Sequence, residues 1–212
     1  WIKLNTLGLT HCIVAKKSAS DANYALYINS MDHLESQFYD GAAFASFEGT
    51  NYLSSNRWYH VAAVYDGAGP VELYVDGQSE SGTWSSGAAA PIQSSPADVT
   101  IGAYINGTAS DITDGSIGHV RIYNGFLSGK QIDSIRLSED ASIMATSTTM
   151  SGYWKGDEGA GSTISDYSGN ANDASTAQGS LAWDETKGIV LDGTTYLSVP
   201  NHTSLDISNN IT

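Results

Sequence analysis

The most regular pattern of hydrophobic and polar positions in this chain lies in residues 57–77, RWYHVAAVYDGAGPVELYVDG. Two runs there alternate between apolar and polar residues, and a period of two places the apolar side chains on one face of a β-strand. The glycine-rich run 66–70 separates the two runs and supplies the flexible backbone that a tight turn requires. Residues 57–77 are therefore predicted to form a β-hairpin.

Similar short runs recur along the rest of the chain. They are separated by residues that favour turns, such as Gly, Asn, Asp and Pro. Strands at intervals of roughly eight to twelve residues are typical of a sandwich or barrel of antiparallel sheets. The predicted strand segments are 1–16, 23–29, 37–47, 99–103, 117–124, 187–191 and 195–199, with a polar turn at 48–51 and a loop at 78–97.

One segment carries a helix signal. Ser128 fits an N-cap, and Gln131 follows three residues later, the spacing at which the two side chains satisfy free N–H groups of the first helical turn. Leu127 and Ile132 flank this cap and can pack as a hydrophobic staple. One short helix is therefore predicted from Gly129 to about Leu137.

The composition agrees with an all-β fold. The chain has 212 residues, of which 41% are hydrophobic and only 15% charged, and it contains 22 Gly and 12 Tyr. A chain of this length can bury a large core in one domain, and its many turn-forming residues suit short strands better than long surface helices. We therefore predict an all-β sandwich of two antiparallel sheets with one short helix.

The charge and the hydropathy of the chain each exclude one kind of partner. Nucleic-acid binding needs a basic surface that neutralises phosphate, but the formal net charge here is −14, with 9 Lys and Arg against 23 Asp and Glu. The sequence also lacks an apolar run long enough to span a bilayer. We expect no nucleic-acid partner and no membrane insertion. Because Trp1 is not an initiator Met, the chain is expected to be processed or excised from a longer one.

Residues with the spacing of a familiar catalytic motif are missing from the sequence. The five His residues show no zinc-binding spacing such as His-Glu-x-x-His, and the adjacent acids Asp157 and Glu158 would point to opposite faces of a strand. The single cysteine, Cys12, lies in an apolar run and is expected to be a buried free thiol. We therefore expect that this protein is not an enzyme.

Four stretches together resemble the laminin G-like, concanavalin A-like jelly-roll family, in the form found in bacterial and archaeal surface proteins. They are RWYHVAAVYDG with ELYVDG, TIGAY, GHVRIYNGFLSGKQI, and GYWKGDEGAGSTISDYSGNANDAS with VLDGTTYLSVPNHTSLDIS. The resemblance implies a jelly-roll sandwich in an extracellular, cell-surface protein. Related glucanases carry acidic residues at alternating positions of one strand, and this sequence has no such Glu-x-Asp-x-x-Glu pattern.

The order of these stretches departs from that of the family, in which the last stretch normally precedes a strand like the one that begins at Trp1. Residues 1–137 thus correspond to the last two thirds of a laminin G-like sandwich, 138–151 to a connector and 152–212 to the first third. Each part alone would expose a sheet edge and an open apolar core to water. Residues 152–212 are therefore expected to complete either the same domain or the neighbouring one.

Two functions follow from these two ways of completing the sandwich. Completion by a neighbouring copy implies head-to-tail assembly by strand exchange, and hence a non-catalytic structural or adhesive module of an extracellular array or filament. Completion within one chain, as in a circular permutation, favours the alternative, a lectin-like module that binds glycans. The sequence leads us to expect the array first and the carbohydrate-binding module as the alternative.

Three kinds of candidate site are present. The oxygen-rich turn around Asp166, Asn170 and Asp173 matches the place where the resemblance implies a structural calcium ion, although a plain Asx-rich turn explains it equally. Trp84 stands alone in the predicted loop, where it either stacks on a sugar or caps the core. The Asn-x-Thr triplets predict glycosylation of an exported protein at Asn106, Asn201 and Asn210.

Overall fold

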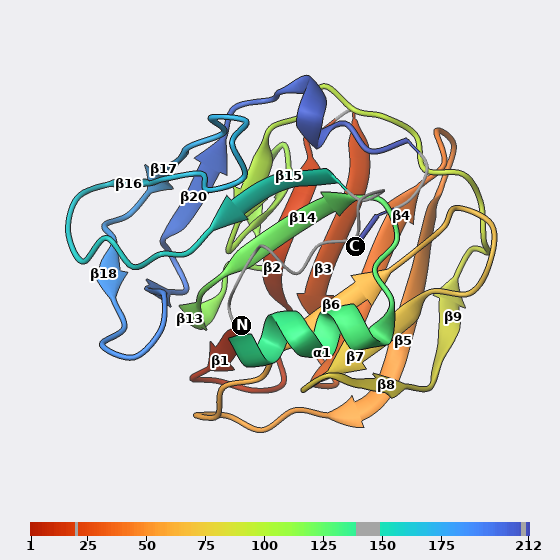
Figure 1. Ribbon diagram of the computed structural model, residues 1–212, viewed down its shortest axis with the longest axis horizontal. Coiled ribbons are helices and arrows are strands. Elements are labelled where there is room, and N and C mark those ends of the chain that lie inside the picture. Colours follow the sequence, from red (N-terminus) through yellow and green to blue (C-terminus); the bar gives the residue numbers. More distant parts are fainter. Residues whose placement is uncertain (20, 139–148, 209–210) are drawn as a thin grey trace.

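Short strands account for most of the structure, a computed structural model that describes residues 1–19, 21–138, 149–208 and 211–212 (Figure 1). The strands are antiparallel to their neighbours throughout the described ladders, and the described residues contain one α-helix. The prediction of an all-β jelly-roll sandwich with one short helix is thereby confirmed.

One layer of the sandwich is a nine-stranded sheet. From one edge to the other it contains β16 (Thr163–Ile164), β17 (Ala174–Gln178), β20 (Tyr196–Val199), β10 (Val99–Ile101), β2 (His11–Lys17), β3 (Ala22–Ile28), β4 (His33–Tyr39), β5 (Phe44–Tyr52) and β9 (Gly82–Ser86). Strands from both ends of the chain thus share this sheet.

The second layer consists of smaller sheets that continue one another. Its strands are β1 (Ile2–Leu4), β6 (Val61–Val64), β7 (Glu72–Val75), β8 (Gln78–Glu80), β13 (Asp114–Ile117), β14 (Val120–Asn124), β15 (Thr149–Trp154), β18 (Ala182–Trp183) and β19 (Ile189–Asp192). The pairing of β6 with β7 confirms the predicted hairpin. The remaining elements are the hairpin of β11 (Tyr104–Asn106) and β12 (Thr108–Ser110), and a 3₁₀ turn, η2 (Thr203–Leu205).

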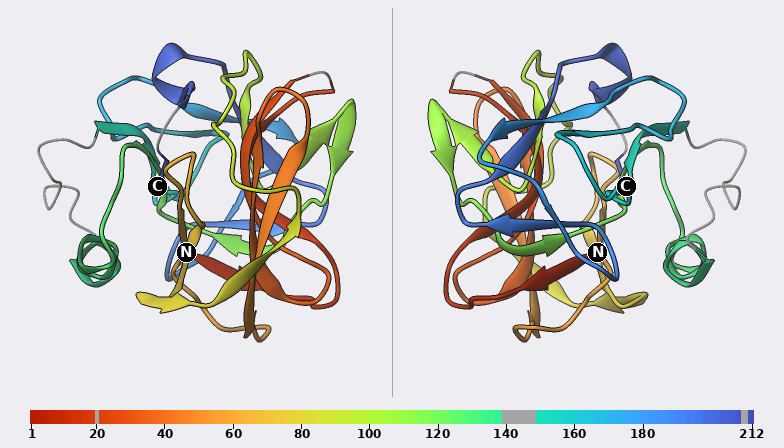
Figure 2. Two further views of the ribbon diagram at one scale, coloured as in Figure 1. Left: turned by 90° about the vertical axis from the view of Figure 1, so that its right-hand side faces the viewer. Right: turned by 90° about the vertical axis from the view of Figure 1, so that its left-hand side faces the viewer.

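The hydrophobic core lies between the two layers, and helix α1 (Gly129–Ser138) covers the outside of the second one (Figure 2). Leu127, Ile132 and Ile135 form a separate apolar cluster beneath the helix. Half of the predicted cap is present, because the Ser128 N–H donates to Gln131 Oε1 at 2.9 Å. The Ser128 hydroxyl donates to the same oxygen at 2.7 Å, whereas the Gln131 N–H donates to the Ser128 backbone carbonyl oxygen at 2.9 Å. Helix α1 therefore begins where the sequence predicts.

Residues 149–212 complete both layers within the same chain. β20 pairs with β10 of the nine-stranded sheet, while β19 pairs with β13 and β15 with β14 in the second layer. Side chains from both parts, such as Ile2 and Leu197, belong to one core cluster. In the described residues, pairings within one chain thus complete both layers. Most of the expected connector, 138–151, lies outside the described residues.

Three local predictions were wrong. The segment 37–47 contains the turn of a hairpin, because Asp40 Oδ1 accepts hydrogen bonds from the N–H groups of Ala42 and Ala43 between β4 and β5. The predicted turn at 48–51 is part of β5, since its polar side chains lie on a strand of which one face is open to solvent. The predicted loop 78–97 includes β8 and β9, whose small polar residues obscure the strand pattern.

Among the described helices, none has the length and apolar character needed to cross a membrane.

Candidate functional site

The outer face of the nine-stranded sheet carries a cleft of about 310 Å³ beside the β11–β12 hairpin. Strands β2, β3 and β4 form its floor, and the hairpin forms one wall. We call it the β2–β4 cleft. It is lined by Thr10, Cys12, Tyr27, Asn29, Glu35, Gln37, Tyr104 and Asp111.

Small residues on the outer face make this cleft possible. A bulge in β2 turns Ile13 and Val14 together into the core, so that Cys12 and Ala15 point outwards. They form a small buried cluster with Ala25, against which Tyr27 and Tyr104 pack from the sides. Two aromatic rings thus flank a floor of small side chains.

Hydrogen bonds fix the polar side chains of the cleft. Glu35 Oε1 accepts a hydrogen bond from the Tyr27 hydroxyl at 2.6 Å, and Glu35 Oε2 accepts one from the Asn29 amide at 3.0 Å. The Tyr104 hydroxyl donates to Gln37 Oε1 at 2.7 Å. Because these side chains are already oriented, a ligand that binds them would lose little of their conformational entropy.

The protonation states of the cleft suit hydrogen bonding and not nucleophilic attack. Burial, together with the hydrogen bond to Glu35, raises the pKa of Tyr27, and burial also raises that of Tyr104, so both hydroxyls stay protonated near neutral pH. Burial likewise raises the pKa of the Cys12 thiol. Cys12 is a buried free thiol, as predicted, and it has no thiolate character.

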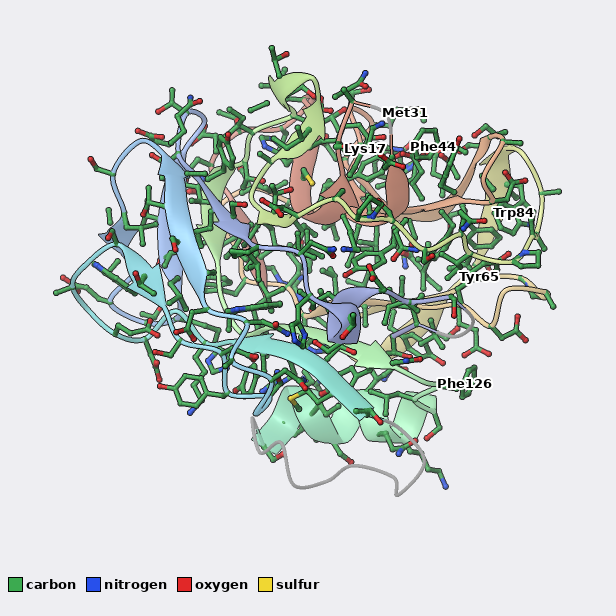
Figure 3. The ribbon with its side chains drawn as sticks, turned by 90° about the horizontal axis from the view of Figure 1, so that it is seen from above. Lys17, Met31, Phe44, Tyr65, Trp84 and Phe126 are labelled. Atoms are coloured by element: carbon green, nitrogen blue, oxygen red, sulfur yellow. The ribbon has the colours of Figure 1, made fainter. Side chains whose placement is uncertain are left out.

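A lysine extends the site beyond the cleft. The Lys17 ammonium lies 5.2 Å from the centre of the Tyr104 ring and 4.8 Å from that of Phe44. Figure 3 shows Lys17 and Phe44 beyond the outer face of the nine-stranded sheet. A cation between two aromatic faces is held by both rings. Lys17 therefore offers a fixed donor next to the wall of the cleft.

A second carboxylate lies opposite Glu35 and was missed by the sequence analysis. Glu48 is the direct partner of Glu35 across the β4–β5 ladder, and its Oε1 lies 2.7 Å from His33 Nδ1. Glu35 and Glu48 are too far apart in the sequence for a search of short motifs to connect them. The signal that could have found them is the Asp40-Gly41 turn, because a hairpin centred there sets the pairing of the two strands.

Trp84 lies at the edge of the core and outside the β2–β4 cleft. Its ring meets Phe47 edge to face with 5.3 Å between ring centres, and it meets Tyr65 of the second layer at 6.2 Å. Figure 3 shows Trp84 and Tyr65 at the same side of the sandwich. Of the two roles considered for Trp84, this position matches the core cap.

The three expected calcium ligands share one turn, but their oxygens do not fit a calcium cage. Asp166 accepts four hydrogen bonds, from the N–H groups of Tyr153, Ser168 and Asn172 and from the Ser168 hydroxyl, at 2.7–3.0 Å. The Asn170 amide nitrogen donates to the carbonyl oxygens of Met150 and Ser151, and Asp173 accepts from the Asp166 N–H. Among the described residues no group of three His, Cys, Asp or Glu side chains is arranged to hold a metal ion. The turn is stabilised by its own hydrogen bonds.

The three asparagines predicted to be glycosylated differ in their surroundings. Asn106 is exposed in the β11–β12 hairpin, next to Gly107 with a φ of 81°. The Asn201 amide oxygen accepts a hydrogen bond from the buried Lys16 ammonium at 2.6 Å. Asn210 lies outside the described residues.

Another polar hollow, of about 370 Å³, lies near Tyr153 and the loops that follow β15 and β18. Its neighbouring aromatic faces are covered by cations. The Arg121 guanidinium lies 4.0 Å from the centre of the Tyr153 ring, and the Lys155 ammonium lies 4.2 Å from that of Tyr167. Tyr104 of the β2–β4 cleft also contacts a cation, Lys17, so these contacts do not separate the two sites. The β2–β4 cleft is taken as the candidate because two tyrosines and several hydrogen-bonded polar side chains line one floor of small residues there.

Comparisons with known proteins agree with the fold. The laminin G family model described as the concanavalin A-like lectin/glucanases superfamily matches residues 1–133. A solved structure from Bacteroides ovatus, described as a candidate carbohydrate-binding protein, superposes with a TM-score of 0.58 at 21% sequence identity and covers 98% of this chain. The chain spans about half of that structure, 53% of its length. A search of curated proteins finds no match.

Proposed function

Because the chain belongs to the concanavalin A-like lectin/glucanase superfamily, we propose that it is a carbohydrate-binding module that holds a glycan in the β2–β4 cleft. The observation that carries this proposal is the combination in one cleft of two tyrosine rings and a fixed set of carboxylate and amide groups. The solved structure from Bacteroides ovatus, described as a candidate carbohydrate-binding protein, supports the same class of ligand.

The chemistry of a sugar ring matches this combination. Its C–H face packs on an aromatic ring, while its hydroxyls both donate and accept hydrogen bonds. In the cleft, Tyr27 and Tyr104 offer the rings, Glu35 and Gln37 keep acceptor positions beyond their internal hydrogen bonds, and Gln37 and Asn29 each keep a second amide hydrogen. The cleft therefore offers both donors and acceptors to the hydroxyls of a bound sugar.

The charge of the protein favours a neutral glycan. Glu35 and Asp111 line the cleft, and the formal net charge of the chain is −14. A uronic acid or a sulfated sugar would be repelled by this field, although Lys17 beside Tyr104 offers one cation. We expect neutral hexoses or pentoses as the preferred units and little dependence of affinity on salt.

A glycan array followed by calorimetric titration with three variants tests this proposal. Tyr104→Ala removes one wall of the cleft and is expected to weaken binding about tenfold or more. Gln37→Ala should weaken it similarly, because it leaves Tyr104 without its acceptor. Tyr52→Ala is the matched control, since Tyr52 is exposed on the same sheet but lies outside the cleft. Equal affinity of all three variants and the unaltered protein would overturn the proposed site.

Trp84→Ala separates the cleft from the site expected from the sequence. Since Trp84 packs on Phe47 and Tyr65, this variant should lower the melting temperature and leave glycan affinity nearly unchanged. Selective loss of binding by Trp84→Ala, with the fold intact, would instead support sugar stacking at Trp84.

We propose that the bound glycan is not cleaved. The superfamily includes glucanases, and two carboxylates placed about 5 Å apart can serve retaining hydrolysis. Here Glu35 is held by Tyr27 and Asn29, and Glu48 by His33, so both acids have fixed partners. Incubation with each bound glycan should release no new reducing ends. Release that Glu48→Gln abolishes would contradict this part of the proposal.

A structural module of an extracellular head-to-tail array remains a second candidate function. It is supported by one observation, the division of a second-layer strand between the two ends of the chain. Ile211, near the end of the chain, pairs with Tyr65 and Asn124. Ile2, near its start, pairs with Tyr59, which precedes Tyr65 on the same stretch of the second layer. In an array, residues 149–212 of one copy would complete the next copy. We propose an extracellular, cell-surface location under either candidate function.

A further inference from the structure

A lysine ammonium is buried at one end of the nine-stranded sheet, on the side that faces the core. The Lys16 side chain has 0% exposure. Its Nζ donates to the Ala97 carbonyl oxygen and to Asn201 Oδ1, both at 2.6 Å, and it lies 3.1 Å from Asp206 Oδ1. One buried nitrogen thus contacts a backbone carbonyl, a carboxamide and a carboxylate.

The pairing of three strands brings these groups together. Lys16 of β2 and Val199 of β20 both stand opposite Val99, which lies in β10 between them. Residues directly opposite each other in a ladder point to the same face, and Val99 belongs to the core cluster. Lys16 therefore extends along the core side of β10 towards Asn201, which lies just beyond the end of β20.

The loop after β20 holds its two side chains in fixed positions. Asp98 Oδ1 accepts a hydrogen bond of 2.9 Å from the Asn201 N–H. The 3₁₀ turn η2 then reverses the chain, with a 2.9 Å hydrogen bond from the Leu205 N–H to the His202 carbonyl oxygen, and the Leu205 side chain is buried. Asp206 follows directly. The carboxamide and the carboxylate thus approach Lys16 from the same loop.

The contact between Lys16 and Asn201 is close to the geometry of nucleophilic attack. Because a carbonyl C=O bond is about 1.2 Å long, the 2.6 Å contact to Oδ1 leaves Asn201 Cγ within about 3.8 Å of Lys16 Nζ. Reacting atoms that are about 3 to 3.5 Å apart are in near-attack position. A small shift of the lysine tip is therefore enough to bring Nζ to this carbon.

The surroundings supply the remaining requirements of the reaction. Burial lowers the pKa of Lys16, against the opposing effect of Asp206, and a desolvated neutral amine is a nucleophile. Asp206 Oδ1 is itself buried, and within the described residues it accepts no hydrogen bond from a group other than Lys16. This carboxylate is therefore free to take up and return a proton.

We propose that Lys16 Nζ and Asn201 Cγ form an isopeptide bond in the folded protein, with Asp206 as the proton carrier. The bond would join β2 to the loop after β20, and so link the two parts of the sandwich, 1–137 and 152–212, covalently. It would also prevent glycosylation of Asn201, because both modifications use the same amide nitrogen. This inference does not depend on glycan binding.

The reaction needs no other reactant. The Lys16 ammonium gives one proton to Asp206, and the free electron pair of Nζ forms a bond to Asn201 Cγ as the C=O π electrons move to Oδ1. Asp206 passes its proton to Nδ2, the C=O bond re-forms and the Cγ–Nδ2 bond breaks. Nζ loses a second proton through Asp206 to the departing ammonia, which leaves as ammonium. The product removes a charge from the core, which favours the bond.

Mass spectrometry of the full chain tests the proposal. The protein is produced in a bacterial host that does not glycosylate asparagine, incubated in the folded state and then denatured. Its mass should be lower than that of its sequence by one ammonia molecule. A tryptic digest should contain residues 4–17 linked to residues 188–212, because trypsin does not cleave after a modified Lys16.

Three variants distinguish this bond from other losses of ammonia. Asn201→Ala and Asp206→Ala, with circular dichroism to show that they fold, should keep the full mass and give no linked peptide. Asn106→Ala is the matched control, because Asn106 precedes a glycine and can lose ammonia by forming a succinimide, and this variant should still show the linked peptide.

The unaltered protein decides the proposal even if a variant does not fold. Full sequence mass, with Lys16 and Asn201 in separate peptides, would overturn the bond and leave Lys16 as a buried ammonium with three acceptors. Loss of ammonia that disappears in Asn106→Ala would likewise overturn it. A linked peptide that persists in Asp206→Ala would overturn the role of Asp206 as proton carrier.

Discussion

Asp166 fixes the turn that follows β16 through four hydrogen bonds to one carboxylate. Asp166→Ala would leave three backbone N–H groups without their acceptor, and we expect a loss of about 2 to 3 kcal/mol of unfolding free energy in chemical denaturation. Asp157→Ala is the matched control, because Asp157 is exposed and should change stability by less than about 0.5 kcal/mol. An effect of Asp166→Ala no larger than that of the control would contradict this role.

The same turn gives a clear expectation for metal removal. Since the Asp166 oxygens are occupied by protein donors, the melting temperature should be the same in calcium and in a chelator. A ligand that binds only the folded state adds about 2.7 kcal/mol at a hundredfold excess over its Kd. A rise of that size in calcium, lost in Asp173→Ala, would restore the calcium site predicted from the sequence.

His60 makes stability depend on pH. Burial, with a smaller contribution from the N-terminus and nearby cations, lowers the pKa of His60 to about 3. The unfolded chain binds a proton near the ordinary His pKa of about 6.5, so His60 contributes stability that is complete above that pH and is lost as the pH falls. Between pH 6.5 and 5 the unfolding free energy should drop by about 2 kcal/mol through His60. Denaturation at both pH values should show a smaller drop for His60→Gln, and an identical drop would contradict the assignment.

Single residues were predictable where one local rule decides their role. The Gln131 side chain accepts from the Ser128 N–H as predicted, because the two residues are three apart in sequence. The role of Glu35 was not predictable in this way, since its partners Tyr27 and Asn29 come from another strand and a turn. From the sequence, Trp84 could either stack on a sugar or cap the core. The positions of the Phe47 and Tyr65 rings match the core cap.

At the scale of elements, the Ser128–Gln131 contact stabilises the start of helix α1, which covers the second layer of the sandwich. Ser128→Ala removes the hydrogen bond from the Ser128 hydroxyl to Gln131 Oε1 and should lower the unfolding free energy by about 1 kcal/mol. Ser134→Ala, within the same helix, is the control and should change it by less than about 0.5 kcal/mol. Equal effects in thermal or chemical denaturation would show that the cap does not stabilise this end of the helix.

Strands were predictable where alternation is strict and less so where polar residues lie on exposed faces. The β6–β7 hairpin follows from its period of two. β5 and β9 were missed in part, because Gly49, Thr50 and Ser85 resemble turn residues although the ladder includes them or their neighbours. The bulge in β2 that opens the floor of the β2–β4 cleft has no signature in the sequence pattern.

At the scale of the whole molecule, the two-sheet architecture was predictable, but the identity of the chain that closes it was not. The family resemblance showed that residues 152–212 correspond to the first third of a sandwich and residues 1–137 to the rest. Completion within one chain and completion by a neighbouring copy satisfy the same apolar pattern. In the structure, β19 and β20 pair with β13 and β10 of the same chain.

This closure predicts the mass of the protein in solution. Light scattering during size-exclusion chromatography should give the mass of a single chain, 22.4 kDa, over a wide range of concentrations. Exchange of residues 149–212 between copies would bury far more than the roughly 2,000 Å² typical of obligate contacts, so such assemblies would resist dilution. A mass that rises with concentration, or stable multimers, would contradict closure within one chain and favour the array.

The most direct test of the proposed function is a crystal structure of the protein soaked with the glycan that binds best on the array. The account predicts sugar density in the β2–β4 cleft, packed between Tyr27 and Tyr104 and hydrogen-bonded to Glu35 and Gln37. Density for the glycan elsewhere, with the cleft empty, would contradict it.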